Sequence, residues 1–492
     1  MGQDPQQLIL MCPCGQKMKV PAEAIGKDAS CVKCGQKIPI TQENAQIATN
    51  GKAQPHPTFD LSDDAAIQRL LEEGKITQGN VDLAVLVNTD IDEPIWSVLV
   101  RLGYVSREDF HRFLVKREGI ASIDLAHYNV PTAALEVLPE SLIRKHLVVP
   151  IDKLGKLLTV TMGNPLDNHA TQAIQAHTGL RVKTMLSTSE DIVRFIRKKY
   201  PSNKNFLSPN LPSTSFSVVE KFYYEKLACP FTERLFSIDH LPICAATVEG
   251  VQQVLHDTLN PVNELVAVLA KDPSATLHVL RIANTEAYGF AGHVDNLGVA
   301  ITLLGPEAIL AHLKGCRLRN ETPTYAANNS FAQICGDACA AISGVANVAT
   351  PPSMKTLGLL SGLGELVLSE CLPTSYEAVI KEFRENGREN DFGSCFDLTA
   401  GDASTFITSF WNLPESIIVP MQNNASISAS TGHSERTAVL SLGLHIARTH
   451  AARKDLGPPT DSEAVECLNI KWANIETIYA DLLQNVPVQQ IA

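Results

Sequence analysis

The sequence predicts a multidomain chain made of a small β-unit, an α+β domain and an all-α domain. With 492 residues the chain is long enough for about three domains that each bury a core. Residues 41–57 and 201–217 are polar without apolar periodicity, which predicts linkers over 41–59 and 201–225. We therefore expect domains over 1–40, 60–200 and 226–455, with a C-terminal helical extension over 456–492.

Composition and charge favour a cytoplasmic protein. Apolar residues make up 45% and charged residues 19% of the chain, and no apolar run approaches the roughly 20 residues of a membrane span. The N-terminus lacks the basic start and apolar core of a signal peptide. The whole net charge of −12 lies in residues 201–492, which hold 18 basic and 30 acidic side chains. Because such a half repels a phosphate backbone, we expect no nucleic-acid partner. The lack of a long apolar run leads us to expect no membrane insertion.

Two close cysteine pairs are the strongest local chemical signal. The four candidate metal ligands are Cys12, Cys14, Cys31 and Cys34, and a glycine follows each pair. Four thiolates at this spacing can converge on one tetrahedral Zn²⁺ and leave no position open for catalysis. The flanking segments 17–20 and 37–40 alternate like short strands.

The first 40 residues resemble the short zinc ribbons at the N-termini of many bacterial signalling proteins. Their first pair departs from that pattern, since it is C-x-C rather than C-x-x-C. We expect one structural zinc ion per chain, because a unit this small buries too little surface to fold unaided. A redox dithiol and a metal-free segment are the alternatives.

A helical repeat opens the second domain. Residues 67–77 and 96–106 each predict an amphipathic helix that ends at a glycine, Gly74 or Gly103. In each copy an isoleucine or valine stands two residues after the glycine, and a threonine or serine then occupies the N-cap position of the following helix.

Strands and helices alternate after this repeat. The expected elements are strands at 147–151 and 157–161 joined by a hairpin about 153–155, a helix from Asn168, a strand over 181–185 and a helix from Ser189. This order, with Leu138-Pro-Glu, Gly163-Asn-Pro-Leu-Asp167 and Thr178-Gly-Leu-Arg-Val182, resembles the N-terminal domain of type II secretion and type IV pilus ATPases, the GspE/MshE N-terminal family. No G-x-x-x-x-G-K-[ST] phosphate loop follows, so the resemblance does not extend to the motor half of those ATPases.

Some members of that family bind cyclic di-GMP through two motifs that begin with Arg-Leu-Gly. The matching positions here are 65–67 (Ala-Ala-Ile) and 94–96 (Pro-Ile-Trp), and Arg117 stands near the expected second glutamine. The literal Arg101-Leu102-Gly103 is out of register, because Gly103 ends a helix. Without arginine for the phosphate and glycine for close backbone approach, an interaction or scaffold role is favoured. Cyclic dinucleotide binding stays open as an alternative.

Mostly helical patterns fill residues 226–455. A second resemblance rests on His240-Leu-Pro-Ile, Leu265 to Pro273, Leu280-Arg-Ile-Ala-Asn284 and Ala300 to Gly305. These segments resemble the HDOD family, a regulatory relative of the HD phosphohydrolases, and imply an all-α fold. Asp272 is expected to cap the helix that begins at Pro273. Asn284 is expected to bond backbone at a helix end.

The resemblance also locates the metal-binding positions of HD enzymes. The His-Asp pair falls at Ser361–Gly362 within an expected helix over 358–368, and the other positions fall at Asn329–Ser330 before a helix from Phe331, near Ala400, and at Asn423–Asn424. These residue types bind a catalytic divalent ion poorly. Independently of register, no histidine occurs between His312 and His433. The literal pair His256-Asp257 lacks partner ligands and is expected at the surface.

The remaining cysteines and two aromatic residues are interpreted as structural. Eight scattered cysteines, from Cys229 to Cys467, predict buried free thiols rather than disulfides. Trp472 and Tyr479 are expected as core anchors of a helix over 470–483.

Together these patterns predict a non-enzymatic bacterial signal-transduction or scaffold protein without catalytic residues. Its output would be contact with an unidentified protein partner, which we expect at an apolar groove of the HDOD domain. One alternative is a sensor of cyclic di-GMP or a related nucleotide. Another is an HD-type phosphodiesterase with an atypical metal site.

Overall fold

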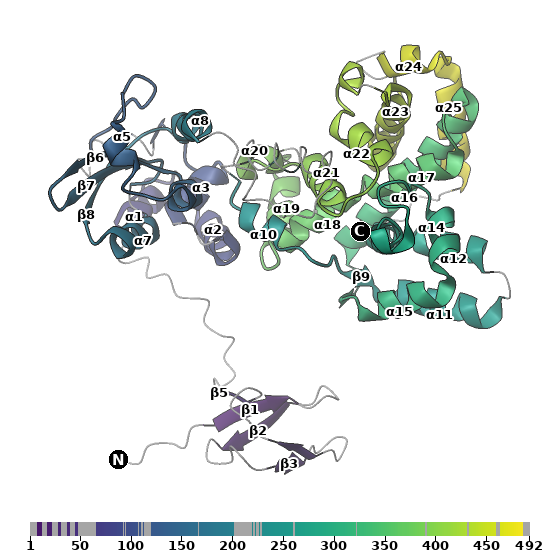
Figure 1. Ribbon diagram of the computed structural model, residues 1–492, viewed down its shortest axis with the longest axis horizontal. Helices are drawn as coiled ribbons and strands as arrows, with labels where there is room; N and C mark the ends of the chain where they lie inside the picture. Colours follow the sequence, from purple (N-terminus) through teal and green to yellow (C-terminus); the bar gives the residue numbers. More distant parts are fainter. Residues whose placement is uncertain are drawn as a thin grey trace. The chain divides into compact units, whose positions relative to one another are not determined.

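The computed structural model describes residues 65–485 with short gaps, together with five strands that precede them (Figure 1). The gaps within that range are 92, 94, 107, 110–111, 113–119, 166, 201–218, 220–221, 223–225, 227–228, 259–260, 321, 389–390, 431 and 459–462. Among the described residues no single helix has the length and apolar composition to cross a membrane. The pair α14 (Leu297–Leu304) and α15 (Pro306–Gly315) meets those criteria only when joined across a bend of 99°.

The N-terminal segment forms two small antiparallel sheets. Its strands are β1 (Gln7–Met11), β2 (Lys17–Pro21), β3 (Asp28–Ser30), β4 (Lys37–Pro39) and β5 (Ala45–Ile47). β1 lies between β2 and β5, and β3 pairs with β4. The two strands expected at 17–20 and 37–40 are therefore confirmed as β2 and β4. Cys12, Cys14, Cys31 and Cys34 lie outside the described residues, so the zinc site stays a prediction.

The helical repeat forms as expected, with glycines after its helices and hydroxyl side chains at the N-cap positions. Its helices are α1 (Ala65–Glu72), α2 (Gln78–Ile91) and α3 (Ile95–Arg101). Gly74 and Gly103 have φ angles of +66° and +77°, a left-handed conformation that side chains other than glycine rarely adopt. The Thr77 and Ser106 hydroxyls accept backbone N–H groups three residues later. Both caps are thus confirmed.

A three-stranded sheet follows in the order β6-β7-β8. Its elements are α5 (Thr132–Leu135), α6 (Glu140–His146), β6 (Val148–Leu154), β7 (Leu157–Met162), α7 (Asn168–Thr178), β8 (Arg181–Leu186) and α8 (Ser189–Lys199). β6 and β7 form the expected antiparallel hairpin with Gly155 at φ +59°, and β8 runs parallel to β7. Ile143, Val149, Leu158, Ile174 and Ile196 belong to its buried apolar core.

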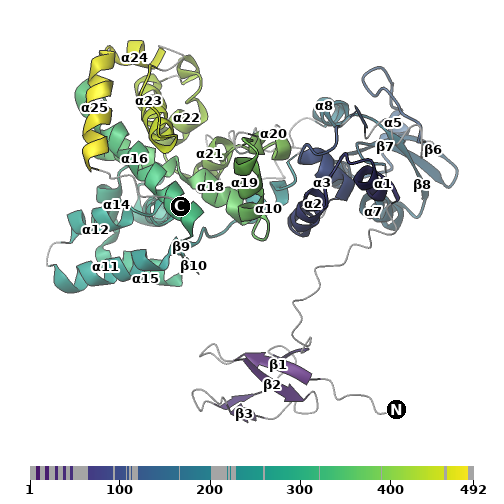
Figure 2. The same cartoon turned by 180° about the vertical axis from the view of Figure 1, so that it is seen from behind.

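Among the described residues from 232 onward, the secondary structure is helical except for one short parallel pairing, between β9 (Ile243–Cys244) and β10 (Leu318–Arg319). Its other helices are α10 (Thr232–Phe236), α11 (Ala245–Asp257), α12 (Val262–Leu269), α13 (Pro273–Ala283), α16 (Pro323–Ala346), α17 (Pro351–Leu360), α18 (Leu363–Cys371), α19 (Tyr376–Glu385), α20 (Phe392–Phe396), α21 (Ala400–Phe410), α22 (Glu415–Gln422), α23 (Ser434–Ala451), α24 (Glu463–Leu468) and α25 (Trp472–Asn485). Within this array α11 and α15 lie side by side at one end, and α24 and α25 lie at the other (Figures 1 and 2).

The long helix α16 packs against α17 and α23 in the centre of the array. Glycines allow the closest approach, because a Cβ on Gly358 would lie 2.7 Å from the Cys335 carbonyl oxygen and from the Gly336 Cα. In the C-terminal extension Tyr479 is buried as expected, whereas Trp472 is only half-buried. Seven of the eight described cysteines are buried and Cys467 is half-buried, and all eight are free thiols.

Candidate functional site

The Ser361–Gly362 position is a turn between two helices, not the interior of one helix. The expected helix over 358–368 is therefore wrong: α17 ends at Leu360 and α18 begins at Leu363. The amides of Ser361 and Gly362 donate to the carbonyls of Gly358 and Leu359, the i to i−3 pattern of a tightened last turn. The Ser361 hydroxyl also donates to the Gly358 carbonyl, at 2.6 Å.

Small and amide side chains close this turn from both neighbouring helices. Asn328 Nδ2 on α16 donates to the Gly362 carbonyl at 2.8 Å, and Ser404 Oγ on α21 donates to the Ser361 carbonyl at 3.2 Å. A Cβ on Gly362 would lie 2.6 Å from the Ala332 Cβ. The space that an aspartate side chain would enter is thus occupied by α16.

The other positions matched to metal ligands of HD enzymes belong to three further helices, α16, α21 and the end of α22. Asn329 and Ser330 lie inside α16 rather than before a helix, so that expectation is wrong; the helix begins at Pro323, where Thr322 accepts the Tyr325 amide as N-cap. Ala400 is the first residue of α21, and its carbonyl oxygen faces Gly364 on α18. Asn423 and Asn424 each donate back to backbone carbonyls of α22.

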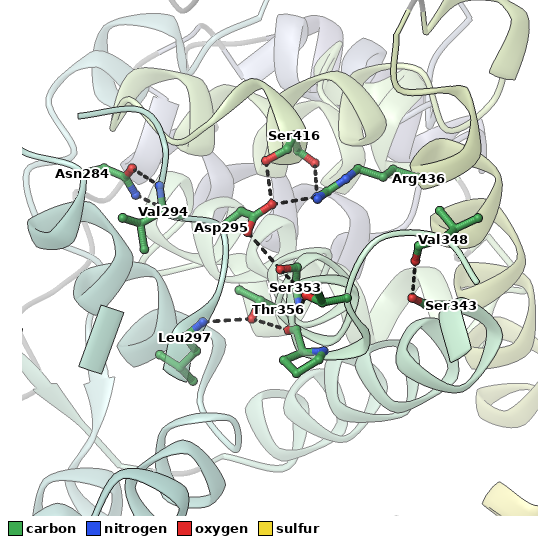
Figure 3. Close-up of polar contacts among 12 residues, drawn as sticks. Asn284, Val294, Asp295, Leu297, Ser343, Val348, Ser353, Thr356, Ser416 and Arg436 are labelled. Atoms are coloured by element: carbon green, nitrogen blue, oxygen red, sulfur yellow. Dashed lines mark hydrogen bonds and ion pairs between the residues drawn. The ribbon is translucent and has the colours of Figure 1, made fainter. Parts of the chain in front are cut away.

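Asp295 is a residue that sequence reasoning missed, and it connects three helices (Figure 3). One carboxylate oxygen accepts from Ser353 Oγ on α17 at 3.0 Å. The other accepts from Ser416 Oγ on α22 at 2.9 Å and from Arg436 Nη1 on α23 at 2.8 Å. The side chains of Asp295 and Arg436 are each about one-fifth exposed, so the network is partly shielded from water. It connects these helices to the loop that carries Asp295.

Asn284 has the role that its position at a helix end predicts. Its Nδ2 donates to the Leu280 and Val294 carbonyls, and its Oδ1 accepts the Val294 amide, each at 2.9 Å (Figure 3). The side chain is buried. Asn284 therefore fixes the loop that carries Asp295. His256 and Asp257 are exposed at the end of α11, as expected, and bond only to each other among the contacts described.

Asp272 does more than cap α13. Its Oδ1 accepts the Ser274 and Ala275 amides, which confirms the predicted N-cap. It also accepts the Tyr325 hydroxyl at 3.0 Å. Its Oδ2 accepts the Cys244 amide and the Thr247 hydroxyl, at 2.8 and 3.1 Å. The carboxyl group is 1% exposed, so this single side chain joins α11, α13 and α16 inside the core.

A cavity of about 530 Å³ opens beside α10 and α15. Charged and polar side chains dominate its lining, among them Arg234, Asp239, His240, Arg317 and Glu370. The expected ligand surface was an apolar groove, and this cavity differs from it in chemistry. Charges of both signs suit a polar or ionic ligand better than an apolar helix.

Arg101 is engaged within the protein. Its guanidinium pairs with Glu93 and donates to the Cys395 carbonyl at 3.1 Å. Arg388 Nη2 donates to the Leu102 carbonyl at 2.8 Å. These contacts agree with the interpretation of Arg101-Leu102-Gly103 as an out-of-register match, because the arginine is already committed to protein groups.

Asp90 caps α19 from a different part of the sequence. The carboxylate accepts the amides of Thr374 and Ser375 and the Ser375 hydroxyl, the last two at 2.8 and 2.6 Å. Asp90 is 7% exposed. Ser375, the N-cap residue of α19, makes no capping bond with its own helix.

We expect Asp90→Ala to lower the free energy of unfolding by about 2–3 kcal/mol, because it leaves the buried amide and hydroxyl of Ser375, and the amide of Thr374, without their acceptor. Asp82→Ala is the matched control, since Asp82 is exposed on the same helix and accepts only from Gln78 among the contacts described. Urea titration followed by circular dichroism measures both values. Equal values for the two variants would contradict the capping role.

Comparisons with known proteins place two domains on this chain. Residues 241–427 match the HDOD domain model, and residues 118–205 match the MshEN domain model. The chain therefore carries an HDOD domain and, before it, an MshEN domain, as both resemblances implied.

Relatives share only parts of the chain. The type IV pilus assembly ATPase PilB of Myxococcus xanthus (strain DK1622) is 30% identical over 112 residues, which is 22% of this chain and 20% of PilB. The chain thus spans about a fifth, or less, of the length of the curated relatives it matches.

Solved structures similar to parts of the chain include the following two. The MmoQ response regulator from Methylococcus capsulatus str. Bath is 24% identical with a TM-score of 0.40, covering 50% of this chain and 99% of MmoQ. MshE solved with cdg is 22% identical with a TM-score of 0.23, covering 27% of this chain and 96% of that one.

Proposed function

We propose that this protein is a non-enzymatic signalling or scaffold protein that acts by binding a protein partner. The observation that best supports this proposal is the structure of the Ser361–Gly362 turn. The Gly362 carbonyl accepts a hydrogen bond from Asn328, and the Ser361 carbonyl accepts one from Ser404. Ala332 occupies the space that a Cβ on Gly362 would need. A hydrolase of the HD type needs a divalent ion there to activate water. Here packed and hydrogen-bonded side chains surround the position where those ligands would stand, and this supports a binding role.

A hydrolysis assay tests this proposal. Full-length protein is incubated with cyclic dinucleotides and added Mn²⁺ or Fe²⁺, with and without a chelator, and products are separated by chromatography. We expect no turnover above a buffer control. Turnover that depends on protein concentration and is abolished by chelation would instead establish a phosphodiesterase with an atypical metal site.

For the N-terminal segment we propose a structural zinc ion held by Cys12, Cys14, Cys31 and Cys34. Support comes from the strands on either side of each pair: Met11 pairs with Lys17, and Ser30 pairs with Lys37. Each cysteine pair therefore belongs to a chain segment between antiparallel strands, the usual setting of a zinc knuckle. The ion would stabilise a unit that buries little apolar surface.

A nucleotide sensor is the second candidate, favoured by the match of residues 118–205 to the MshEN domain. The positions expected to hold its Arg-Leu-Gly motifs argue against it, since Ile95 and Trp96 are buried side chains. Calorimetric titration of the full chain with cyclic di-GMP decides between the two. No heat at high micromolar ligand would exclude the sensor, and saturable binding to one site per chain would support it.

A further inference from the structure

A cluster of two histidines and one cysteine lies in the HDOD domain, away from the Ser361–Gly362 turn. His278 is in the middle of α13, His312 is in the last turn of α15, and Cys316 follows four residues later. One nitrogen of each histidine and the Cys316 Sγ all lie within 4.8 Å of one another. His312 and Cys316 therefore both belong to the C-terminal end of α15, since Cys316 directly follows the last residue of that helix.

The geometry of His278 is that of a positioned ligand. Its Nε2 lies 2.8 Å from the Leu241 carbonyl oxygen, which can only accept, so Nε2 carries the proton and Nδ1 carries the lone pair. Nδ1 faces His312 Nε2 at 3.4 Å. Metal-bound histidines commonly donate their second ring nitrogen to a backbone carbonyl in this way. Two nitrogens on one tetrahedral zinc ion are roughly 3.3 Å apart, as follows from bonds of about 2.0–2.1 Å.

We propose that His278, His312 and Cys316 bind a divalent metal ion of the zinc class. Two imidazoles and one thiolate form a borderline-soft set of the kind that Zn²⁺ and Co²⁺ accept. Three protein ligands leave a fourth position open, and Cys316 and His240 line the 530 Å³ cavity into which that position would face. The site is thus suited to an exchangeable ion or to a further ligand on the metal, unlike the closed four-cysteine site proposed at the N-terminus.

Charge and protonation are compatible with this assignment. Burial lowers the pKa of His278 to about 4, and burial also lowers the pKa of His312, so both imidazoles are neutral at neutral pH. Burial raises the pKa of the Cys316 thiol, so metal binding must displace its proton. Arg281 is one nearby cation, and its guanidinium is held over Trp411 and donates to the Asp239 carbonyl. Arg234 and Arg317 line the same cavity as Cys316.

The test compares metal content of full-length variants by plasma mass spectrometry after dialysis against Zn²⁺ and then metal-free buffer. His312→Gln and Cys316→Ser remove one ligand each; His256→Gln and Cys467→Ser are matched controls outside the cluster. All four substitutions are also made in a chain that carries Cys12→Ser, Cys14→Ser, Cys31→Ser and Cys34→Ser, in which the N-terminal site is absent. In that background we expect one zinc per chain, kept by the two controls and lost by both ligand variants.

Cobalt gives an independent readout of the thiolate. In the same serine background, Co²⁺ should produce a sulfur-to-metal charge-transfer band that is lost in Cys316→Ser and kept in Cys467→Ser. No stoichiometric metal in the background chain, or unchanged metal in either ligand variant, would overturn the proposal. The result is separate from the proposed function, since that rests on the hydrolysis assay and on the turn at Ser361–Gly362.

Discussion

Gly364→Ala is expected to lower the free energy of unfolding by about 3 kcal/mol or more. A Cβ at this position would overlap the carbonyl oxygen of Ala400, at the crossing of α18 with α21. A backbone atom cannot rotate away, so the two helices must separate and lose their packing. Circular dichroism during urea unfolding measures the change.

Gly344→Ala is the matched control for Gly364→Ala. Gly344 is exposed in the last turn of α16, and a Cβ there would meet nothing within 4 Å. Alanine favours a helix over glycine by about 1 kcal/mol, so this variant should be slightly stabilised. Opposite signs for the two variants would establish that the α18–α21 crossing requires glycine, and similar values would contradict it.

Asp272→Ala is the second substitution with a large expected effect, a loss of about 4 kcal/mol of unfolding free energy. It removes the N-cap of α13 and leaves the Cys244 amide and the hydroxyls of Thr247 and Tyr325 without this acceptor in the core. Losing a cap costs about 1 kcal/mol, and each buried polar group left unsatisfied costs about 1–3 kcal/mol.

Asp167→Ala isolates the capping part of that effect. Asp167 is the N-cap of α7 and its side chain accepts the Ala170 amide, without the further bonds that Asp272 makes. We expect it to lose about 1 kcal/mol in the same urea titration. If the two aspartates cost the same, the interhelical bonds of Asp272 contribute little and the proposed role is wrong.

The turn at Ser361–Gly362 shows where prediction from sequence failed. The resemblance to HD proteins implied one continuous helix over 358–368, with the His-Asp positions at Ser361–Gly362. The contacts that end α17 come from elsewhere: Asn328 donates to the Gly362 carbonyl, and Ala332 occupies the space above Gly362. Those residues precede the turn by about 30 positions, so no local pattern reports them. The error at Asn329, placed before a helix that in fact begins at Pro323, has a different cause, because Thr322 as N-cap and Pro323 in the first turn are local signals of the true start.

The sequence by itself determined the features that depend on near neighbours. Gly74 and Gly103 end helices, Asp272 begins one, and the hairpin turns at Gly155. Each follows from a conformation or hydrogen bond within a few residues, which local sequence specifies. The domain resemblances likewise rest on ordered motifs along the chain.

Only the tertiary structure decided which distant polar groups meet. Asp295 joins Arg436 across 141 positions, and His278 faces His312 across 34. Neither pair has a periodic signal, because such contacts depend on how whole helices cross rather than on the spacing of residues along one helix. The buried polar network and the proposed metal site therefore emerge from packing, while the helices that carry them were predictable in outline from their apolar patterns.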